Sequence, residues 1–402
     1  MLEQTGWMLP VAAVAGAVIT LLLVRSFSMI APRVGLIDIP DKRKQHEGHV
    51  PLVGGIAFVL AYFLVAIVML PSLEMFFRFA ACTAILLAIG VLDDIGELRA
   101  SARLIAQFGV AALLIMLGET PVSTFGDLLG YGAISLAPIT GFLFTVFCVM
   151  SLINGLNMLD GLDGLAGGVG AIMLGAFLLI AMLSGIKSMV AHVSVLLACL
   201  AGFLVFHNFR SPLRRKLVFL GDAGSMVLGL ALAWTAIALA ERPGATMYPV
   251  TAVWVLGLVV LDTTATVLRR LMQKRSPLSA GRDHLHHLLL ELGCTPQISV
   301  AILMTSTAVM AAVGVLSWQF GVPEAWLAGI FAVLGAVYFV TLDIGWRHVS
   351  QKKISLIDFL QELEPGIARE IEDEMKVAEP MRKAGEYEIT NKQNERSWAE
   401  TK

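Results

Sequence analysis

The stretch Asn154-Gly-Leu-Asn-Met-Leu-Asp-Gly-Leu-Asp-Gly-Leu-Ala-Gly-Gly168 joins two strongly apolar runs of the chain. Its two amides, two carboxylates and five glycines are more polar than a membrane helix normally tolerates. Asn154 and Asn157 share a face if a helix continues through them. Asp160 and Asp163 fall among glycines, which allow the backbone to close on a ligand. The same side chains are also typical of a polar turn that merely caps two helices. The choice between a functional site and a turn therefore depends on where the other polar clusters of the chain lie.

The composition around this stretch is that of a polytopic membrane protein. Of the 402 residues, 57% are hydrophobic and 15% are charged, with a mean hydropathy of +0.78, whereas a soluble protein carries about 25% charged residues. We therefore expect an all-α membrane fold of about eleven transmembrane helices. The expected spans are roughly residues 7–30, 52–70, 75–92, 103–118, 138–156, 167–184, 188–206, 223–240, 247–267, 298–320 and 323–346.

Several features are uninformative or exclude a class of function. The net charge of −2 gives no reason to expect a nucleic-acid partner. Three of the four cysteines lie inside apolar runs, so we interpret them as packing residues and not as disulfides or a zinc site. The first apolar run lacks a basic start and is long enough to span the membrane, so it is expected to be the first span and not a cleaved signal.

The distribution of basic residues predicts the orientation in the membrane. The loops and span ends of one side carry fifteen Lys and Arg residues, against three on the other side. By the positive-inside rule the richer side is cytoplasmic, which places the N-terminus outside and the C-terminus inside. The fifteen are Arg33, Lys42, Arg43, Lys44, Arg99, Arg103, Arg210, Arg214, Arg215, Lys216, Arg269, Arg270, Lys274, Arg275 and Arg282.

All of the unusual polar clusters fall on this same predicted side. They are Pro40–His46, Asp93-Asp94, Asn154–Asp163, Phe219–Asp222 and His284–His287. Their shared side predicts one active site, built from cytoplasmic loops at the inner membrane face. A transporter or flippase is the alternative class, but it is expected to show repeat symmetry and ionisable groups near the middle of the membrane. A non-catalytic scaffold has no need for five such clusters.

The carboxylates point to a divalent cation. Adjacent Asp93 and Asp94 at the end of a span are costly unless a cation or a basic partner compensates them, although a helix end emerging into water is the simpler alternative. Asp222, between Gly221 and Gly224 at a helix start, suits a Mg²⁺–diphosphate unit, because exposed N–H groups favour phosphate and oxygen ligands favour magnesium. Its alternative role is that of a helix N-cap.

The basic and histidine clusters suit phosphate. His284, His286 and His287 lack a cysteine partner for zinc, and cationic or hydrogen-bonding histidines beside Arg270, Arg275 and Arg282 suit phosphate better. Lys44 and His46 follow Asp41 in one short segment. The positive-inside rule explains the positive charge of this segment, but not its aspartate, proline or histidine. Within the spans, Asp262 is expected to pair with Arg269, Arg270 or a backbone group, and His192 to be a satisfied interior histidine.

Together these features suggest phosphoryl transfer between a soluble nucleotide and a lipid, with catalysis by positioning and charge neutralisation. The motifs resemble those of the polyprenyl-phosphate N-acetylhexosamine-1-phosphate transferases, most closely the bacterial branch that uses UDP-GlcNAc and undecaprenyl phosphate. The resemblance covers about residues 10–345. It rests on Arg43-Lys-x-His46 with Pro51-Leu-Val-Gly-Gly55, Asp93-Asp94, Asn154-x-x-Asn157-x-x-Asp160-Gly-x-Asp163-Gly, Gly221-Asp-Ala-Gly-Ser225 and His284-x-His-His287.

The resemblance implies a role for each matched position. Asn157 and Asp222 are expected to hold Mg²⁺, with Mn²⁺ as a substitute, and Asn154 and Asp163 to contact substrate. Asp160 would meet the uracil edge and Phe219 would stack on the ring. Asp93 would deprotonate or orient the lipid phosphate, supported by Asp94. Lys44, His46, Arg103 and Arg282 would bind phosphate charge, and the catalytic His284, His286 and His287 would face the sugar or the diphosphate.

The implied reaction converts UDP-GlcNAc and undecaprenyl phosphate to undecaprenyl-diphosphate-GlcNAc and UMP, at the bacterial inner membrane, as the first membrane step of a cell-surface polysaccharide. Another UDP-N-acetylhexosamine or UDP-MurNAc-pentapeptide is the alternative donor. Two domains are expected: a membrane transferase domain, 1–346, and a charged cytoplasmic tail, 347–402. A homodimer stays open, because the lipid-facing surfaces are uniformly apolar, and so does a covalent phospho-sugar intermediate on an aspartate.

Overall fold

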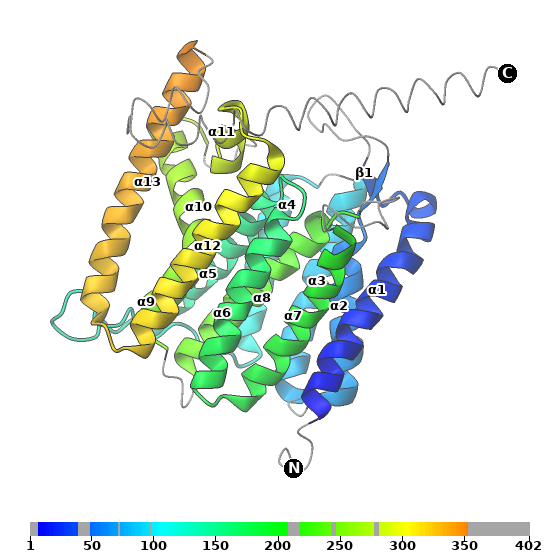
Figure 1. Ribbon diagram of the computed structural model, residues 1–402. Coiled ribbons are helices and arrows are strands. Elements are labelled where there is room, and N and C mark those ends of the chain that lie inside the picture. The colour runs from blue at the N-terminus through cyan, green and yellow to red at the C-terminus, as the bar shows by residue number, and fades with distance from the viewer. Residues whose placement is uncertain are drawn as a thin grey trace, which may run out of the picture.

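The computed structural model describes residues 7–38, 49–70, 73–96, 98–207, 218–242, 247–276 and 281–352. These residues form thirteen helices and one two-stranded antiparallel ribbon, β1 (Ile37–Asp38) with β2 (Val50–Pro51), so the all-α membrane fold is confirmed (Figure 1). The helices are α1 (Met8–Val34), α2 (Gly54–Met69), α3 (Leu73–Gly96), α4 (Ala100–Met116), α5 (Pro138–Leu159), α6 (Leu165–Leu183), α7 (Lys187–His207), α8 (Gly221–Glu241), α9 (Pro249–Val255), α10 (Gly257–Met272), α11 (Leu285–Glu291), α12 (Pro296–Gln319) and α13 (Glu324–Lys352).

The expected spans all overlap apolar helices, although their number of membrane crossings stays a prediction. Among the described residues, eight helices are long and apolar enough to cross a membrane, and α9 with α10 form one further, bent pair. The helices α2 and α4 are shorter apolar helices of 16 and 17 residues. The predicted tail, 347–402, begins inside α13, and residues beyond Lys352 lie outside the described part of the chain.

The span expected at 247–267 is not one straight helix, which corrects the sequence analysis. It breaks between α9 and α10, whose axes differ by 81°. Leu256 at the break has φ −87° and ψ 8°, outside the helical range. Gly257 follows it against Met310, whose terminal carbon lies 2.2 Å from where a Cβ would stand. The bend directs α10 toward the end of the bundle where the polar clusters lie.

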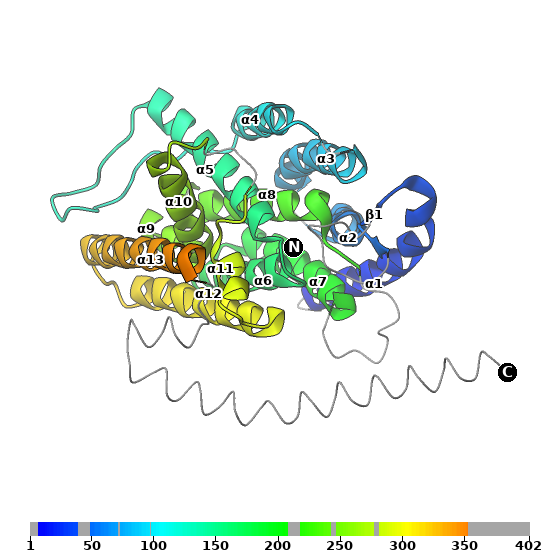
Figure 2. The same cartoon turned by 90° about the horizontal axis from the view of Figure 1, so that it is seen from above.

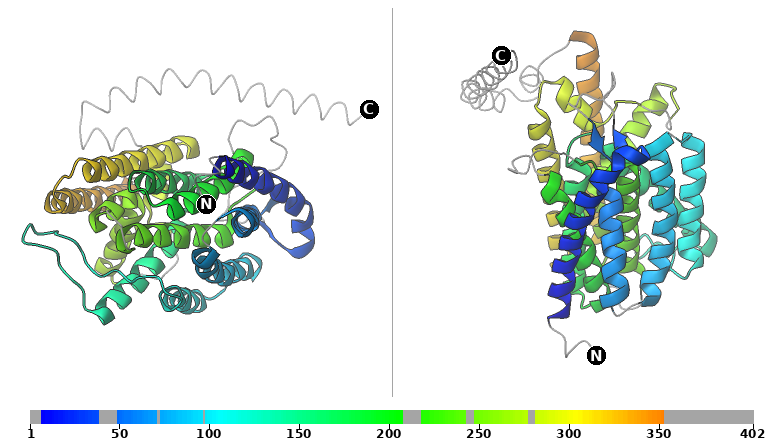
Figure 3. Two further views of the ribbon diagram at one scale, coloured as in Figure 1. Left: turned by 90° about the horizontal axis from the view of Figure 1, so that it is seen from below. Right: turned by 90° about the vertical axis from the view of Figure 1, so that its right-hand side faces the viewer.

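Helix α8 is the centre of the bundle. Figure 2 shows it enclosed by its neighbours, and it contacts α5, α3, α6 and α2. All of its residues from Ala223 to Leu239 are buried, which is the pattern of a helix that is apolar on every side. By contrast, α1 and α13 lie at the periphery and bury only a small part of their surface (Figure 3). The start of α8 is thus held in place by the helices that surround it.

Small residues allow two helices to approach that first turn closely. A Cβ on Gly55 of α2 would stand 2.2 Å from the Cα of Gly224, and a Cβ on Gly90 of α3 would stand 2.3 Å from the Cα of Ala223. Such backbone contact is possible only without a side chain, as at the small-residue crossings of membrane helices. These contacts fix the position of Asp222 between them.

Backbone hydrogen bonds join the segment before α8 to the start of α2. The amide of Phe219 donates to the carbonyl of Pro51, and the amide of Gly54 donates to the carbonyl of Phe219. The amide of Gly55 donates to Leu220 in the same way. The Pro51–Gly55 motif and the Phe219–Asp222 motif therefore form one structural unit, although they lie far apart in the sequence.

Polar side chains inside the bundle and at its other end are paired. The Tyr62 hydroxyl lies 2.7 Å from Nδ1 of His192, so this histidine is interior, as expected, and hydrogen-bonded at that nitrogen. Glu119, 4% exposed, forms an ion pair with Arg242 at 2.5 Å and accepts a hydrogen bond from the indole of Trp234. These contacts join helices and lie away from the clusters that carry chemistry.

Candidate active site

A carboxylate cluster with one arginine lies where the C-terminal end of α3 meets the starts of α4 and α8. The guanidinium of Arg103 lies 2.7 Å from Asp93 and 3.8 Å from Asp222. Asp93 is only 4% exposed, and its other oxygen accepts the backbone N–H of Leu98 at 2.7 Å. Because both of its oxygens are engaged, Asp93 is better placed to orient Arg103 than to remove a proton.

Asp94 caps α8 from a neighbouring helix. Its two carboxylate oxygens accept the backbone N–H groups of Asp222 at 2.8 Å and Ala223 at 3.2 Å. These two N–H groups are among the free donors of a helix N-terminus. Because Asp94 occupies them, they are not available to phosphate, contrary to the expectation from the sequence. Asp222 is not the N-cap either, because that position is Leu220. Gly221 precedes it with φ +75°, a conformation that favours glycine.

Asn157 joins α5 to this cluster. Its amide nitrogen donates to Asp222 at 2.7 Å and to the Ser225 hydroxyl at 3.0 Å. One turn earlier, the amide nitrogen of Asn154 donates to the side-chain carbonyl of Gln107 on α4 at 2.5 Å. Sequence reasoning missed Gln107, which is 1% exposed. The feature of the sequence that could have identified it is a single amide side chain inside an apolar span, where a polar group needs a partner.

The Asp160–Gly164 loop ends α5 beside the same carboxylates. Burial raises the pKa of Asp160 well above its usual range, and the negative charges of Asp222, Asp94 and Asp163 raise it further. Such surroundings favour the neutral, protonated form of the carboxyl group, which can donate a hydrogen bond to a ligand. Gly161 touches the histidine segment, because a Cβ there would stand 2.5 Å from Nε2 of His286. The loop therefore links the carboxylates to the histidines.

The histidine segment lies at the start of α11. His286 is fully buried, and its two ring nitrogens have no hydrogen-bond partner among the described residues. Burial, with the neighbouring His287, lowers the pKa of His286 to about 3. Burial and the charge of Arg282 lower the pKa of His287 to about 4. At neutral pH both rings are uncharged, so of the two expected roles they suit hydrogen bonding and not cationic binding.

Of the two partners expected for Asp262, the arginines pair instead with Asp283, and Arg269 also with Asp343. Arg269 and Arg270 each lie 3.0 Å from Asp283, and Arg275 lies 3.4 Å away. Although burial raises the pKa of Asp283, the hydrogen bond from Arg270 and the charges of the three arginines hold it below its usual range. Asp262 instead accepts a backbone N–H, from Leu285, as the other expectation had it.

The structure thus brings together most of the side chains that the sequence singled out. Asp93, Asp94, Arg103, Asn157 and Asp222 contact one another directly. Phe219 lies half-buried just before α8, and Arg282 is exposed beside the histidines. Lys44 and His46 lie outside the described residues, so their expected roles stay predictions.

The described side chains suit a divalent cation only if a bound substrate supplies further coordinating oxygens. No group of three or more His, Cys, Asp or Glu side chains in the described ranges is arranged to hold a metal ion. Magnesium, however, is commonly bound by one or two protein oxygens together with substrate phosphates. The Asp222 carboxylate, 39% exposed at its side chain, and the amide oxygen of Asn157 are suitable donors for such a shared site.

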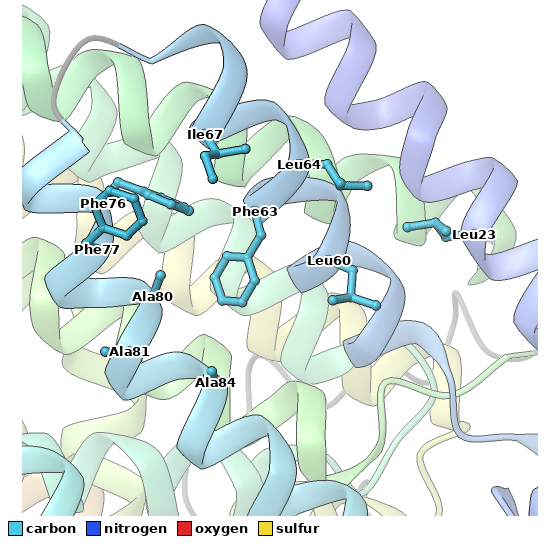
Figure 4. Close-up of a pocket in the computed structure, with 10 residues that line it drawn as sticks. All are labelled: Leu23, Leu60, Phe63, Leu64, Ile67, Phe76, Phe77, Ala80, Ala81 and Ala84. Atoms are coloured by element: carbon cyan, nitrogen blue, oxygen red, sulfur yellow. The ribbon is translucent and has the colours of Figure 1, made fainter.

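An apolar groove lies on another face of the bundle, between α1, α2 and α3 (Figure 4). Figure 4 shows side chains of Leu60 and Phe63 from α2 facing Phe76 and Ala80 of α3, with Leu23 of α1 beside them. Its ten lining residues are all apolar. The groove therefore has no group for bond-breaking chemistry, which leaves the polar cluster as the candidate active site.

The fold and this cluster define a transmembrane enzyme whose polar centre lies at one end of a helix bundle. Residues 76–240 match the family described as glycosyl transferase family 4, and the chain belongs to this family of transmembrane glycosyltransferases. It is 34% identical over 339 residues to the undecaprenyl-phosphate alpha-N-acetylglucosaminyl 1-phosphate transferase of Haemophilus influenzae, covering 83% of this chain and 92% of that protein. It is 30% identical to the protein of the same description from Escherichia coli (strain K12), covering 79% of this chain and 86% of that protein.

Proposed function

We propose that this protein transfers GlcNAc-1-phosphate from UDP-GlcNAc to undecaprenyl phosphate, releasing UMP. The observation that carries the proposal is the cluster of linked contacts at one end of the bundle: Arg103 with Asp93 and Asp222, Asn157 with Asp222, and Asp94 with the N–H groups that begin α8. Such a centre suits two phosphate-bearing substrates and the cation that accompanies them. The names of the relatives, undecaprenyl-phosphate alpha-N-acetylglucosaminyl 1-phosphate transferase, support the same transferred group and the same acceptor.

In the proposed reaction an oxygen of the lipid phosphate attacks the phosphorus that carries the sugar. The bond from that phosphorus to the bridging oxygen breaks, and UMP leaves with the bridging oxygen and its electron pair. A phosphate monoester has a second pKa of about 6, so the acceptor is already ionised at neutral pH and needs orientation more than deprotonation. Arg103, held by Asp93 at 2.7 Å, is suited to bind that phosphate.

The other residues bind and orient the donor. Asp160 is suited to the uracil edge, with Phe219 near the ring, and His286 and His287 to hydrogen bonds with the sugar or the diphosphate. Asn157 and Asp222 would hold Mg²⁺, or Mn²⁺ in its place, which would neutralise charge on the diphosphate as UMP leaves. Asp94 keeps Asp222 in place through the two N–H groups of α8.

The place of the reaction follows from the predicted orientation. With the polar centre on the positively charged side, the enzyme would take its nucleotide sugar from the cytoplasm of a bacterium and act at the inner membrane. The product would begin a cell-surface polysaccharide.

The deciding experiment measures UMP released by the purified protein with Mg²⁺, undecaprenyl phosphate and each of a panel of UDP-sugars. Release with UDP-GlcNAc that EDTA and Asp222→Ala abolish would support the reaction and its metal. Release with only another UDP-N-acetylhexosamine would replace the donor. An absence of release with every donor would contradict the proposal and favour a transporter. Normal Mg²⁺-dependent turnover by Asp222→Ala would contradict the metal assignment alone.

A further inference from the structure

A buried carboxylate on α10 contacts the histidine segment from behind. Asp262 is 1% exposed, and its Oδ2 lies 2.7 Å from Nδ1 of His284. Its Oδ1 accepts the backbone N–H of Leu285 at 2.9 Å and the hydroxyl of Tyr338, on α13, at 2.8 Å. The proposed reaction, as described above, gives this three-way contact no role.

The contact determines which nitrogen of His284 is available. A carboxylate oxygen only accepts hydrogen bonds, so the hydrogen in the contact with Asp262 belongs to Nδ1 of the ring. The hydroxyl of Thr266, 3.4 Å away, faces the same nitrogen. Nε2, on the opposite edge of the ring, has no hydrogen-bond partner among the described residues. It is therefore the atom that remains to meet a ligand.

Asp262 also fixes the backbone that carries the histidines. His284 is the N-cap residue of α11, and its side chain does not cap the helix. The hydrogen bond from Leu285 to Asp262 satisfies one of the free N–H groups of this short helix. The side chain and the backbone at this point are thus both held by one residue of α10.

The ring of His284 lies one side chain away from the carboxylate centre. It is parallel to the ring of His286, with an angle of 8° and 6.0 Å between the ring centres. His286 in turn touches the loop at Gly161, between Asp160 and Asp163. The paired rings of His284 and His286 therefore adjoin the loop that carries Asp160 and Asp163.

We propose that Asp262, itself held by Tyr338, is a positioning residue that presents Nε2 of His284 to the diphosphate of the nucleotide sugar. The inference rests on the proposed function and specifies which atom binds the anion. When the diphosphate arrives, Nε2 takes a proton from the surrounding water and donates it in a hydrogen bond to a phosphate oxygen. The Asp262 carboxylate stabilises the resulting imidazolium from the other edge of the ring, as an outer carboxylate does for a functional histidine.

The test is a double-mutant cycle of Asp262→Asn and His284→Gln, measured as kcat/KM for UDP-GlcNAc across a pH series. Asp262→Asn keeps the size of the side chain, but it removes the charge that stabilises the imidazolium. We expect kcat/KM to fall about 10- to 100-fold, and the alkaline limb of the pH profile to move to lower pH. Tyr338→Phe, which removes one hydrogen bond to Asp262, should produce a smaller change in the same direction.

The double variant separates positioning from a merely structural role. If Asp262 acts through His284, Asp262→Asn should cost nothing more once His284 is Gln. The inference would be overturned if the losses of kcat/KM in the two single variants multiply in the double variant. It would also be overturned if Asp262→Asn does not shift the pH profile. Thr264→Val is the matched control, because Thr264 is exposed on the same helix and should retain wild-type kinetics.

A second measurement keeps the inference testable if no donor is turned over. Nitrogen NMR of histidine-labelled protein in detergent reports which ring nitrogen carries the hydrogen, and His284→Gln identifies the signal. The wild type should show His284 with hydrogen on Nδ1, and Asp262→Asn should lose this preference. An unchanged His284 signal in Asp262→Asn would refute the positioning role, whereas absence of UMP release in the wild type bears on the proposed function alone.

Discussion

At the scale of single residues, the carboxylates differ in role although the sequence shows them as alike. Asp93 holds Arg103, Asp94 caps α8, and Asp222 is left with a partly exposed side chain. Asp160 is enclosed by its negative neighbours. Four identical side chains therefore differ in their contacts: Asp93 orients Arg103 and Asp94 caps α8, whereas metal binding by Asp222 and base recognition by Asp160 are proposed roles. Only contacts between distant parts of the chain create these differences.

Gly221→Ala should disable the site while leaving most of the bundle intact. Gly221 has φ +75°, where a side chain costs about 1–2 kcal/mol. A Cβ there would also stand 2.8 Å from the Asp94 carboxylate that caps α8. We expect UMP release to fall by at least 10-fold and the melting temperature to fall slightly.

The control for this substitution is Gly109→Ala. Gly109 is exposed on α4, and a Cβ there has no neighbour within 4 Å. Activity should be unchanged, since alanine suits a helix at least as well as glycine. Equal activities for the two variants would show that the Asp94 cap is not needed.

His286→Leu should stabilise the protein and inactivate it. A buried ring without hydrogen bonds costs about 1–3 kcal/mol, and leucine removes that cost. The pKa of His286 is lowered to about 3, against about 6.5 when unfolded, so between these values the unfolded state binds the proton more readily. The stability of the wild type is therefore fully present above about pH 6.5 and declines as the pH falls.

Thermal unfolding in detergent at several pH values checks this expectation. The variant should melt at a higher temperature near pH 7 and lose less stability on acidification than the wild type. His49→Leu is the control, because His49 is exposed and its replacement should leave the pH dependence as it is. A lower melting temperature for His286→Leu at pH 7 would mean that the buried ring is a stabilising element.

At the scale of elements, the site depends on how closely α2, α3 and α5 approach α8. Glycines at these crossings let backbones touch: a Cβ on Gly229 of α8 would stand 2.6 Å from the Cα of Ile153 on α5. Since Asn157 is one turn further along α5, this crossing also sets its distance to Asp222. The packing of these helices therefore also determines the geometry of the candidate site.

Gly55→Ala should test this dependence directly. Its Cβ would stand 2.2 Å from the Cα of Gly224, and neither backbone can yield without moving a helix. Overpacking of this kind costs about 1–3 kcal/mol, and a displaced α8 would carry Asp222 away from Asn157. We expect a lower melting temperature and at least a 10-fold loss of UMP release.

Gly175→Ala provides the matched comparison on α6, where a Cβ has no neighbour within 4 Å. It should behave as the wild type in both measurements. Wild-type activity in Gly55→Ala would show that the site tolerates separation of α2 from α8.

At the scale of the whole molecule, the sequence predicted which clusters share an end of the bundle better than it predicted their contacts. Apolar run lengths located the spans, and alternation of their direction grouped the polar loops. The bend at Leu256, the Asp94 cap and the pairing of Asp262 with His284 were not predictable, because each depends on the packing of helices distant in sequence. Gln107 and Tyr338 were missed for the same reason, because the sequence does not show which residue a single polar side chain in a span will contact.

The orientation in the membrane is the remaining whole-molecule prediction. The polar centre lies at the end of α5 that carries Asn157, so the loop before α5 lies at the opposite end. Tyr131 in that loop is 96% exposed, and Gln273, just after α10, is exposed at the end that carries the site. The excess of basic residues predicts that the site end lies in the cytoplasm.

Labelling of single added cysteines with a membrane-impermeant maleimide will decide the orientation. In intact spheroplasts Tyr131→Cys should react and Gln273→Cys should not, whereas permeabilised cells should label both. The native cysteines give a low background, because Cys82, Cys199 and Cys294 are buried and Cys148 is partly buried. If Gln273→Cys is the one labelled from outside, the site cannot draw a nucleotide sugar from the cytoplasm. The proposed reaction would then lose its donor, whatever the geometry of its carboxylates.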